Sequence, residues 1–435
     1  MTTPIYDFVS AYAKSGITRM HMPGHKGRGE LGFEAYDITE ICGADVLYSA
    51  DGIIEESESN LSSLYGTAHS FYSTQGSTLA IFAMLHLATR GSDRPKVLAA
   101  RNVHSAFVRA SALLDLDVEF LYPESDSHLC ECNITADQLR SRLSLAESKP
   151  CAVYVTSPDY LGNMLDISAL AEVCRSFDLP LLVDNAHGAY LRFLSRDQHP
   201  ITLGAAMCAD SAHKTLPVLT GGAYLHISPD YPEYTDGARS ALSLFASTSP
   251  SYLTLSSLDL CNAALDGGYA EKITHTASIV TELKAKISDM GFAVRSSEPL
   301  KITIAKGTDL AEHLRQSGVE VEFADDDYTV LMITPQNNDS DFERLISALS
   351  CYKQVDEAAK KIFNIKPHAA KMTIRQAVFA PCEMIAVENA WGRICASPTV
   401  SCPPAVPIVV SGEMIAEDDI ALFKHYRIDK VCVVK

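Results

Sequence analysis

The sequence predicts an α/β fold in which a mostly parallel sheet is flanked by helices, and three observations lead to this class. Short apolar runs rich in branched residues recur between about residues 60 and 230, segments with helical periodicity separate them, and 47% of the 435 residues are hydrophobic. Continuous apolar strands joined by helices are typical of a parallel sheet that is covered on both faces. A chain of this length also exceeds what one hydrophobic core normally supports, so we expect further domains.

The large domain is expected to span residues 41–260, and its elements can be placed from these patterns. Apolar runs predict four of its strands, at residues 96–100, 118–122, 151–157 and 180–185. Helical periodicity predicts helices over residues 78–89 and 168–177. Ligands of such sheets bind beyond the carboxyl ends of the strands, so the residues that follow each run are the first candidates for chemistry.

An N-terminal arm, residues 1–40, precedes this domain. It begins with a short amphipathic helix and continues through the irregular segment HMPGHKGRG. His21 and His25 have the i, i+4 spacing of a helical metal pair, but Pro23 and Gly24 lie between them and disfavour a helix. We therefore expect no metal at these histidines.

Two further regions follow the large domain. Residues 261–350 predict a smaller α+β domain, in which a long amphipathic helix over residues 264–291 leads into the apolar segments GFAVRSS, LKITIAK, GVEVEF and TVLMITP. Residues 351–435 form a C-terminal extension, which is expected to begin with a helix over residues 352–363. Its proline-rich part cannot be a central strand, so it should be an extended surface or active-site segment.

Charge and composition argue against several classes of protein. The formal net charge of −18 and the pI near 5.2 would repel phosphate backbones and anionic lipid surfaces. No apolar run approaches the roughly 20 residues that a membrane span needs, and the N-terminus has no basic segment followed by an apolar stretch. We expect a cytoplasmic protein that binds neither nucleic acid nor membrane. Its 12 cysteines are spread without a CxxC pair and are expected to be reduced thiols.

Two segments carry the residue types of an imine-forming site. Asp184 ends the apolar run PLLVDN, where a carboxylate would be costly unless paired, and a protonated pyridine nitrogen would be such a partner. Lys214 follows a strand-like run and can form an imine with a cofactor aldehyde. A lone lysine is usually solvated, but DNAH followed by SAHK at this spacing favours a pyridoxal-phosphate (PLP) site. His104 follows another strand and either stacks on the cofactor ring or is an ordinary core or loop histidine.

Small and hydroxyl residues near these segments are candidates for binding a phosphate. Three of them come directly before an apolar helix, whose N-terminal N–H groups and hydroxyls would form a phosphate cradle. An ordinary Ser/Thr helix cap accounts for the same three residues equally well. The candidate phosphate ligands are Gly76, Ser77, Thr78, Ser211 and His213.

Nine motifs in order resemble the major domain of the Orn/Lys/Arg decarboxylase family, which are PLP enzymes of the aspartate-aminotransferase fold (fold type I). The resemblance runs nearly end to end and matches a short form without the extra N-terminal domain of the large members. The motifs are MPGHKG (22–27), QGST (75–78), NVH (102–104), TSPDYLG (156–162), DNAHGA (184–189), SAHK (211–214), STSPSY (247–252), GVEVE (318–322), and ENAWGR followed by PPAVP and GE in the tail.

The resemblance implies a role for each matched position. Lys214 would be the Schiff-base lysine, and Asp184 would be the partner of the pyridinium nitrogen. His104 would stack on the cofactor ring, with Ala186 packed on the opposite face, and His187 would lie near the substrate carboxylate. The residues in contact with the phosphate would be Ser77, Thr78, Ser211 and His213.

Two more positions extend the implied site. Thr248 would reach the phosphate of the neighbouring subunit, so a homodimer or a higher homo-oligomer with active sites at the subunit interface is implied. Glu322 matches a position that can meet the distal cation of a basic amino acid, although it could equally well be an ordinary exposed acid. Asp325 and Asp326 are nearby candidates for the same role.

The sequence departs from the family pattern at three places. Ser105 stands where the family often has Lys, Gln75 replaces a common Asn, and SCPPAVP, which contains Cys402, replaces the usual YPPGIP. These departures could alter the choice of substrate without touching the imine chemistry.

The function implied is PLP-dependent decarboxylation of arginine, lysine or ornithine to the amine and CO2, as in polyamine biosynthesis. The substrate amine would displace Lys214, and Asp184 would keep the pyridine nitrogen protonated while the bond from Cα to the carboxylate breaks. An aminotransferase or another PLP enzyme would use the same two residues. A non-catalytic homologue that regulates a decarboxylase would have no chemical need for Lys214, and the choice among the three substrates needs pocket geometry.

Overall fold

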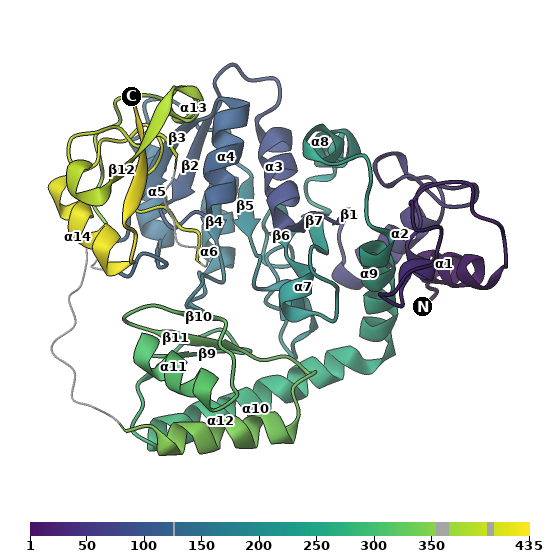
Figure 1. Cartoon of the computed structure of the whole chain (residues 1–435). Coiled ribbons are helices and arrows are strands. Elements are labelled where there is room, and N and C mark those ends of the chain that lie inside the picture. Colours follow the sequence, from purple (N-terminus) through teal and green to yellow (C-terminus); the bar gives the residue numbers. More distant parts are fainter. Residues whose placement is uncertain (125–126, 354–364, 398–403) are drawn as a thin grey trace. The chain divides into compact units, whose positions relative to one another are not determined.

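The computed structural model describes residues 1–124, 127–353, 365–397 and 404–435, and the chain divides into two compact units (Figure 1). The first unit consists of Met1–Arg90 and Pro180–Thr274, and the second consists of Gly91–Leu179 and His275–Lys435. Each unit is therefore built from two separate stretches of chain. The finer division into an arm, a large domain, a small domain and a C-terminal extension stays a prediction.

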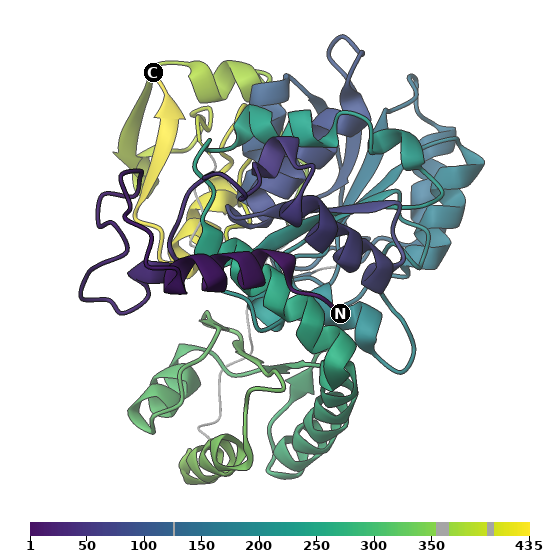
Figure 2. The same cartoon turned by 90° about the vertical axis from the view of Figure 1, so that its right-hand side faces the viewer.

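The first unit contains the arm and the elements around Lys214. Its helices and strands are α1 (Pro4–Lys14), α2 (Ile53–Tyr65), β1 (His69–Ser73), α3 (Gly76–Thr89), β5 (Leu181–Asp184), β6 (Met207–Asp210), α7 (Ala212–Thr215), β7 (Ala223–Ile227), α8 (Ala238–Phe245) and α9 (Tyr252–Ala264). Helix α1 contacts α9, and Figures 1 and 2 both show the two helices side by side.

The second unit contains the remaining elements. Those before residue 180 are β2 (Lys96–Ala100), α4 (Ser105–Leu114), β3 (Asp117–Leu121), α5 (Ala136–Ser144), β4 (Ala152–Thr156) and α6 (Ile167–Ser176). After α10 (Ala270–Asp289), which begins in the first unit, they are β8 (Val294–Arg295), β9 (Lys301–Ile304), α11 (Thr308–Gln316), β10 (Phe323–Ala324), β11 (Thr329–Met332), α12 (Asp339–Cys351), α13 (Ile374–Phe379), β12 (Cys382–Ala386), α14 (Glu417–His425) and β13 (Lys430–Val434).

A seven-stranded sheet in the order β1-β7-β6-β5-β4-β2-β3 forms the core of the fold. Strands β2, β3 and β4 pair in parallel, as do β5 and β6, whereas β7 is antiparallel to both β1 and β6. The predicted α/β class with a mostly parallel sheet is confirmed. A four-stranded antiparallel sheet, β10-β11-β9-β8, and a two-stranded ribbon, β12-β13, complete the strands.

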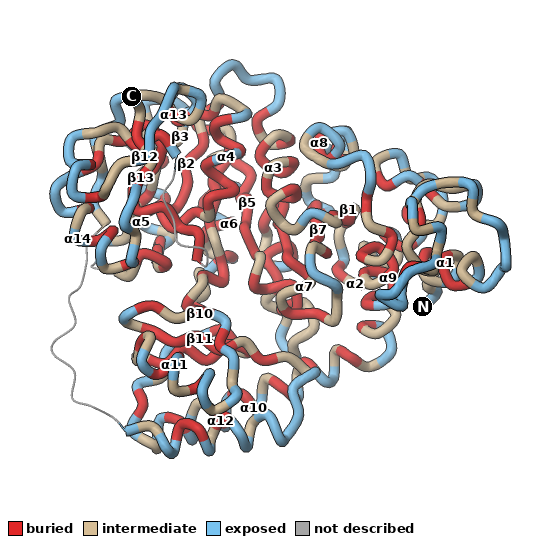
Figure 3. The backbone as a smooth tube through the Cα atoms, in the orientation of Figure 1, coloured by how far each residue is buried: buried red, intermediate tan, exposed pale blue. Residues whose placement is uncertain are grey.

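Burial explains why the strands of the large sheet read as continuous apolar runs. Every residue of β5, β6 and β7 is buried, and Figure 3 colours the segments labelled β5 and β7 mostly red. Polar side chains at the ends of these strands are thus taken out of water unless a cleft or a ligand reaches them. No helix in the described part of the chain is both long enough and apolar enough to cross a membrane.

The structure corrects three sequence predictions. The helix expected over residues 264–291 is interrupted, because a π-helical turn at Leu265–Tyr269 contains non-helical backbone at Gly267 and Gly268. The strand expected over residues 318–323 is reduced to its last residue, Phe323. The helix expected over residues 352–363 has no counterpart at residues 352–353, which follow the end of α12, and the rest of it lies outside the described residues, as does Cys402.

Candidate active site

Lys214 and His187 lie side by side in the first unit. Lys214 belongs to the short helix α7 directly after β6, and His187 belongs to the turn that follows β5. Since β5 and β6 pair in parallel, their carboxyl ends meet at one edge of the sheet. Lys214 Nζ lies 3.0 Å from His187 Nε2. An imidazole nitrogen at this distance can accept a proton from the lysine, which leaves the amine in its nucleophilic form.

The carboxylate of Asp184 lies at the end of β5 and is almost inaccessible to water, with 2% of its surface exposed. Its Oδ1 accepts a hydrogen bond from the backbone N–H of Ala186 at 3.2 Å, which holds the side chain against its own turn. A buried carboxylate at this edge of the sheet is suited to pairing with a cationic group of a ligand.

Two hydroxyl groups from distant parts of the chain meet at the start of α3. Ser211, which follows β6, donates from Oγ to Ser77 Oγ at 2.8 Å. Gly76 donates its N–H to Gly221 O at 2.7 Å, so the first turn of α3 is also fixed to the loop before β7. The sequence placed both serines at a phosphate site, and the structure brings them together. Thr78 lies one residue further along α3 and is half-buried.

His213 is held by one carbonyl group. Its backbone N–H donates to Gly222 O at 3.1 Å, and its Nδ1 lies 2.9 Å from the same oxygen. Because a carbonyl oxygen only accepts hydrogen bonds, the proton of this imidazole is on Nδ1. The second glycine of the segment LTGG thus fixes both the position and the tautomer of His213.

These residues fit PLP by the chemistry of their donors and by the space they leave. An aldehyde, a pyridine nitrogen and a phosphate call for an amine, a carboxylate and a set of N–H and O–H donors, and the first unit supplies all three. Gly76 has a φ of +72°, and a Cβ built there would meet nothing within 4 Å. The N-terminus of α3 therefore has open space beside it, where a phosphate would accept hydrogen bonds from N–H groups and hydroxyls.

His104 and Glu322 belong to the second unit. His104 is the N-cap of α4, and its Nδ1 accepts a hydrogen bond from the N–H of Ala106 at 3.1 Å. The next residue, Ser105, donates its N–H to Ala405 O at 2.8 Å. Ala405 has a φ of +57°, so the tail is not extended at the residue that contacts the start of α4. Residues 404–410 of the tail form no strand, and residues 398–403 lie outside the described residues.

Glu322 is exposed and hydrogen-bonded to a motif residue. Tyr160, in the TSPDYLG segment after β4, donates its hydroxyl to Glu322 Oε1 at 2.8 Å. The backbone of this segment is held by the buried Lys301, whose Nζ donates to Asp159 O at 3.1 Å and to Tyr160 O at 3.3 Å. Burial lowers the pKa of Lys301, and it raises the pKa of the Asp159 carboxyl to about 6.

The two other acids considered for the distal cation already have protein partners. Asp325 is buried, and its Oδ2 lies 2.8 Å from His128 Nε2. Asp326 is exposed and forms an ion pair with Arg427 at 2.8 Å. Glu322 differs from both, since it is exposed and its Oε1 is bound by the neutral Tyr160 hydroxyl.

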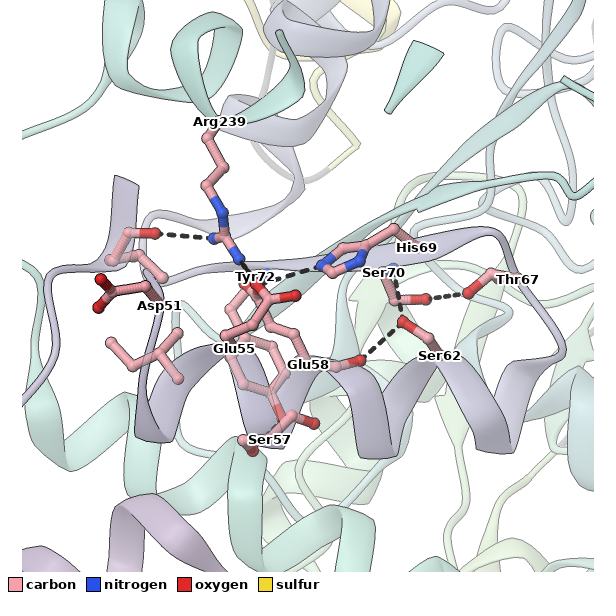
Figure 4. Close-up of polar contacts among 12 residues, drawn as sticks. Asp51, Glu55, Ser57, Glu58, Ser62, Thr67, His69, Ser70, Tyr72 and Arg239 are labelled. Carbon is pink, nitrogen blue, oxygen red and sulfur yellow. Dashed lines mark hydrogen bonds and ion pairs between the residues drawn. The ribbon is translucent and has the colours of Figure 1, made fainter. Parts of the chain in front are cut away.

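Thr248 is exposed in the segment that follows α8, where it is open to contact from a second chain. Helix α8 is fixed to α2 by Arg239, which donates to the buried Glu58 at 2.7 Å, to Glu55, and to Leu47 O at 3.0 Å (Figure 4). The helix that precedes the Thr248 segment is thus held by ion pairs within the first unit.

Sequence reasoning missed several residues that build this site. Tyr160 was part of a quoted motif but was given no role, and Lys301 lies in an ordinary apolar run. Asn185 and Asp210 stand next to candidate residues, yet their contact joins two strands and has no periodic signal. Gly221 was visible as one of two adjacent glycines, and its backbone φ of +95° is the reason for glycine there.

Comparisons with known proteins agree with this geometry. Residues 3–306 match the model of the Orn/Lys/Arg decarboxylase major domain, and residues 353–429 match that of the C-terminal domain of the same family. Arginine decarboxylase of Bacillus subtilis is 28% identical over 463 residues, which covers 97% of this chain and 93% of the relative.

Solved structures show the same fold. The lysine decarboxylase of Francisella novicida has a TM-score of 0.84 at 17% identity, covering 100% of this chain and 81% of that one. A structure of SPT with PLP has a TM-score of 0.55 at 14% identity, covering 68% of this chain and 75% of that one. The fold is therefore that of the fold type I PLP-dependent enzymes.

Proposed function

Because the chain belongs to the Orn/Lys/Arg decarboxylase family and is a PLP-dependent decarboxylase, we propose that it converts a basic L-amino acid into the corresponding amine and CO2. The observation that carries this proposal is the pairing of Lys214 Nζ with His187 Nε2 at 3.0 Å, together with the buried carboxylate of Asp184 at the end of β5. Arginine is the substrate we expect first, since relatives that match over nearly the whole chain are named arginine decarboxylase. Lysine and ornithine are the alternatives.

The proposed cofactor site is centred on Lys214 and Asp184, and each residue is given the role that the family resemblance implies. When bound, PLP withdraws the electron pair that the departing carboxylate leaves on Cα. Lys214 would bind the cofactor aldehyde, Asp184 would hold a proton on the pyridine nitrogen, and His104 and Ala186 would pack on the two ring faces. The phosphate would be held by Gly76, Ser77, Thr78, Ser211 and His213.

The proton transfers are assigned to the lysine and the histidine. His187 Nε2 can take a proton from Lys214 Nζ, which frees the lysine amine to react. After CO2 has left, the proton held by His187 would pass back through Lys214 to the substrate Cα. His187, which is 5% exposed, would also bound the space for the substrate carboxylate and keep water from it.

Glu322 is proposed to meet the distal cation of the substrate. Its carboxylate is exposed, and the hydroxyl of Tyr160 binds one of its oxygens, so the other is free to accept from a guanidinium or an ammonium group. A negative charge at this position favours a basic substrate over a neutral amino acid of the same length.

A homodimer is proposed as the active form. The first unit exposes several large apolar side chains, among them Met20 at 88%, Leu31 at 71% and Met22 at 67%. Exposed apolar residues that gather in one segment are typical of a surface that another chain covers. Such a partner would also cover Thr248 and bring it to the phosphate of the neighbouring subunit.

The test of the proposed function is amine release from an equimolar mixture of L-arginine, L-lysine and L-ornithine with PLP present, followed by mass spectrometry. We expect agmatine to appear first, with cadaverine and putrescine slower. Formation of keto acids in place of amines would contradict the proposed reaction, and cadaverine or putrescine as the main product would correct the substrate.

A further inference from the structure

The carboxylate of Asp210 is fully buried at the end of β6, four residues before Lys214. Four side chains of the first unit face it. Asn185 donates from Nδ2 to Oδ1 at 2.8 Å, and the Cys208 thiol donates to the same oxygen at 3.6 Å. His199 Nε2 lies 3.0 Å and His226 Nε2 lies 3.4 Å from Oδ2. A buried carboxylate needs such partners, since an unpaired one would be costly.

Asn185 stands between the two residues of the β5 turn to which the proposed function gives roles. It directly follows Asp184 and lies two residues before His187. Its side chain is tightly placed, because a Cβ added to Gly188 would lie 2.0 Å from Asn185 Oδ1. The hydrogen bond from Asn185 to Asp210 therefore joins the turn after β5 to the turn after β6.

The charge on Asp210 is stabilised by the two histidines. Burial by itself would raise the pKa of this carboxyl, but His199 and His226 outweigh it and hold the pKa well below its usual range. Burial lowers the pKa of His226. Asp210 is thus ionised at neutral pH, and both of its oxygens act as acceptors.

The histidines are themselves fixed by the rest of the unit. The ring of Tyr65 stacks on His226 with 4.3 Å between centroids, and its edge faces His199 at 5.1 Å. His226 Nδ1 lies 2.7 Å from Ser70 Oγ, and Ser70 belongs to the polar contacts between α2 and β1 in Figure 4. Asp210 therefore connects the β5 turn, through the two histidines, to Tyr65 and Ser70.

We propose that Asp210 is a positioning residue that holds the Asp184 turn in register with the Lys214 turn through its hydrogen bond to Asn185. The proposal rests on the proposed function in one respect, which is that Asp184 and Lys214 bind the same cofactor. His199, Cys208 and Asp210 are residue types that a metal could also bind. However, His199 and Asp210 already lie at hydrogen-bonding distance from each other, so the cluster satisfies itself.

The reciprocal exchange of the two residues gives a sharp test. In Asp210→Asn the side chain has one acceptor oxygen and one NH2 donor, whereas the carboxylate has two acceptor oxygens. The NH2 group must therefore face a donor, which is either Asn185 Nδ2 or His199 Nε2. In the double variant Asn185→Asp with Asp210→Asn, the new amide donates to the new carboxylate and still accepts from His199. The hydrogen bond between positions 185 and 210 and the net charge are thus restored, while the weaker contact from the Cys208 thiol is lost.

The matched control is Asp259→Asn, which changes another fully buried acid of the same unit. Asp259 accepts hydrogen bonds from Ile5 N and Tyr6 N, both at 2.9 Å, and from Ser57, and none of these residues lies in the turns after β5 and β6. The Asp259→Asn control therefore replaces a buried carboxylate by an amide without touching either turn, so faster exchange in the turns of Asp210→Asn alone would report the contact with Asn185.

The first measurement is hydrogen exchange of the cofactor-free protein, which does not depend on the reaction. We expect Asp210→Asn to speed exchange in peptides covering residues 184–188 and 211–215 by about tenfold, because a hydrogen bond to a charged group is lost. The Asp259→Asn control should leave these peptides unchanged, and the double variant should return them to within about twofold of the wild type. If Asp210→Asn does not fold, Asn185→Ala, which keeps Asp210 and His199 paired, must show the same local effect.

The second measurement is PLP affinity and the visible absorbance of the bound cofactor. We expect weaker PLP binding, by about tenfold, in Asp210→Asn and Asn185→Ala, with recovery in the double variant. Three results would overturn the proposal. The first is unchanged hydrogen exchange in both turns of Asp210→Asn, and the second is equally fast exchange there in the Asp259→Asn control. The third is a double variant in which exchange and PLP affinity do not recover. A wild-type protein that forms no amine would contradict the proposed function instead, and the exchange measurement would still decide the role of Asp210.

Discussion

The charge of Glu322 is expected to determine how well a basic substrate binds. Glu322→Gln keeps an acceptor for the Tyr160 hydroxyl but removes the negative charge. We predict that KM for L-arginine rises about five- to tenfold with little change in kcat or PLP affinity, as expected for one partly exposed ion pair. Steady-state kinetics at low and high salt measures this, because screening should reduce the difference.

Asp326→Asn is the matched control, since this nearby exposed acid pairs with Arg427 instead. It should leave KM unchanged. If Glu322→Gln behaves like the control, Glu322 is an ordinary surface acid and the distal cation binds elsewhere.

Asp259 gives a prediction for the pH dependence of stability. Burial raises the pKa of its carboxyl to about 6, from an ordinary value of 3.8. The stability that this group contributes is therefore fully present below about pH 3.8 and is lost as pH rises through about 6. Asp259→Asn cannot titrate. We predict that its free energy of unfolding, relative to wild type, increases by about 1–2 kcal/mol between pH 4 and pH 7.

Denaturant unfolding at several pH values measures this difference. Asp326→Asn, an exposed acid, should show no such trend in the same window. A relative stability of Asp259→Asn that falls as pH rises would mean that the buried carboxylate is stabilised by its partners, with a pKa below its usual value.

At the level of elements, the approach of the loop before β7 to the start of α3 depends on a glycine. Gly221 has a φ of +95°, and a Cβ there would lie 2.9 Å from Thr74 O, while its carbonyl accepts from Gly76 N. We predict that Gly221→Ala costs about 2 kcal/mol of stability and weakens PLP binding, because backbone must shift at the proposed phosphate site.

Gly91→Ala separates the cost of a positive φ from the cost of the close contact with Thr74 O. Gly91 has a similar φ of +81°, but a Cβ there would meet nothing within 4 Å. This control should cost only the conformational strain, about 1 kcal/mol, and leave PLP affinity unchanged. Equal effects of both variants on PLP binding would contradict the account of the α3 cradle.

The central strands of the large sheet could be predicted from the sequence because they are buried, and the edge strand β3 is apolar enough to be recognised although it is only partly buried. The run KVLAA is β2 from end to end, and the runs at residues 118–122, 151–157 and 180–185 differ from β3, β4 and β5 by only one or two residues at their ends. Where helical segments separate such short apolar runs, each run favours a buried strand of a parallel sheet.

The expected strand over residues 318–323 and the expected helix over residues 264–291 were wrong for local reasons, which the hydrophobic periodicity of the sequence does not show. The alternation in GVEVEF suggested a strand, but Gly318 has a φ of +78° and Val319 N donates to Leu314 O at 2.8 Å. The end of α11 therefore uses the first residues of the expected strand. Gly267 and Gly268 interrupt the long helix because glycine is a weak helix former, a preference that the amphipathic pattern does not include.

The candidate site was predictable where its reactive or polar residues directly follow the end of a predicted strand. Lys214 with His187, and Ser77 with Ser211, were expected together from motifs and now lie within 3.0 Å and 2.8 Å of each other. The hydrogen bond between Asn185 and Asp210 joins two parallel strands and depends on their register, so a single sequence cannot show it. The functional roles of these residues stay predictions.

For the whole molecule, the exposed apolar arm predicts association. We expect light scattering to give a mass of about twice 47.2 kDa. Met20→Ser combined with Leu31→Ser should shift the protein toward monomer and lower PLP affinity, because Thr248 would no longer reach a neighbouring phosphate. Leu145→Ser is the control, since this residue is also 77% exposed but lies in the second unit. A monomer that binds PLP and turns over normally would contradict the dimer.

The most direct test of the central claim is the fate of a carboxyl-labelled substrate. Wild-type protein with PLP is given L-arginine carrying ¹³C in its α-carboxyl group, and labelled CO2 and agmatine are quantified beside the Lys214→Ala variant. We predict equal amounts of labelled CO2 and agmatine from the wild type. The variant should give neither product and should lack the yellow absorbance of the bound cofactor. Label that stays in a non-volatile product with all three basic amino acids, or turnover that persists without Lys214, would contradict the assignment of this chain as a lysine-anchored PLP decarboxylase.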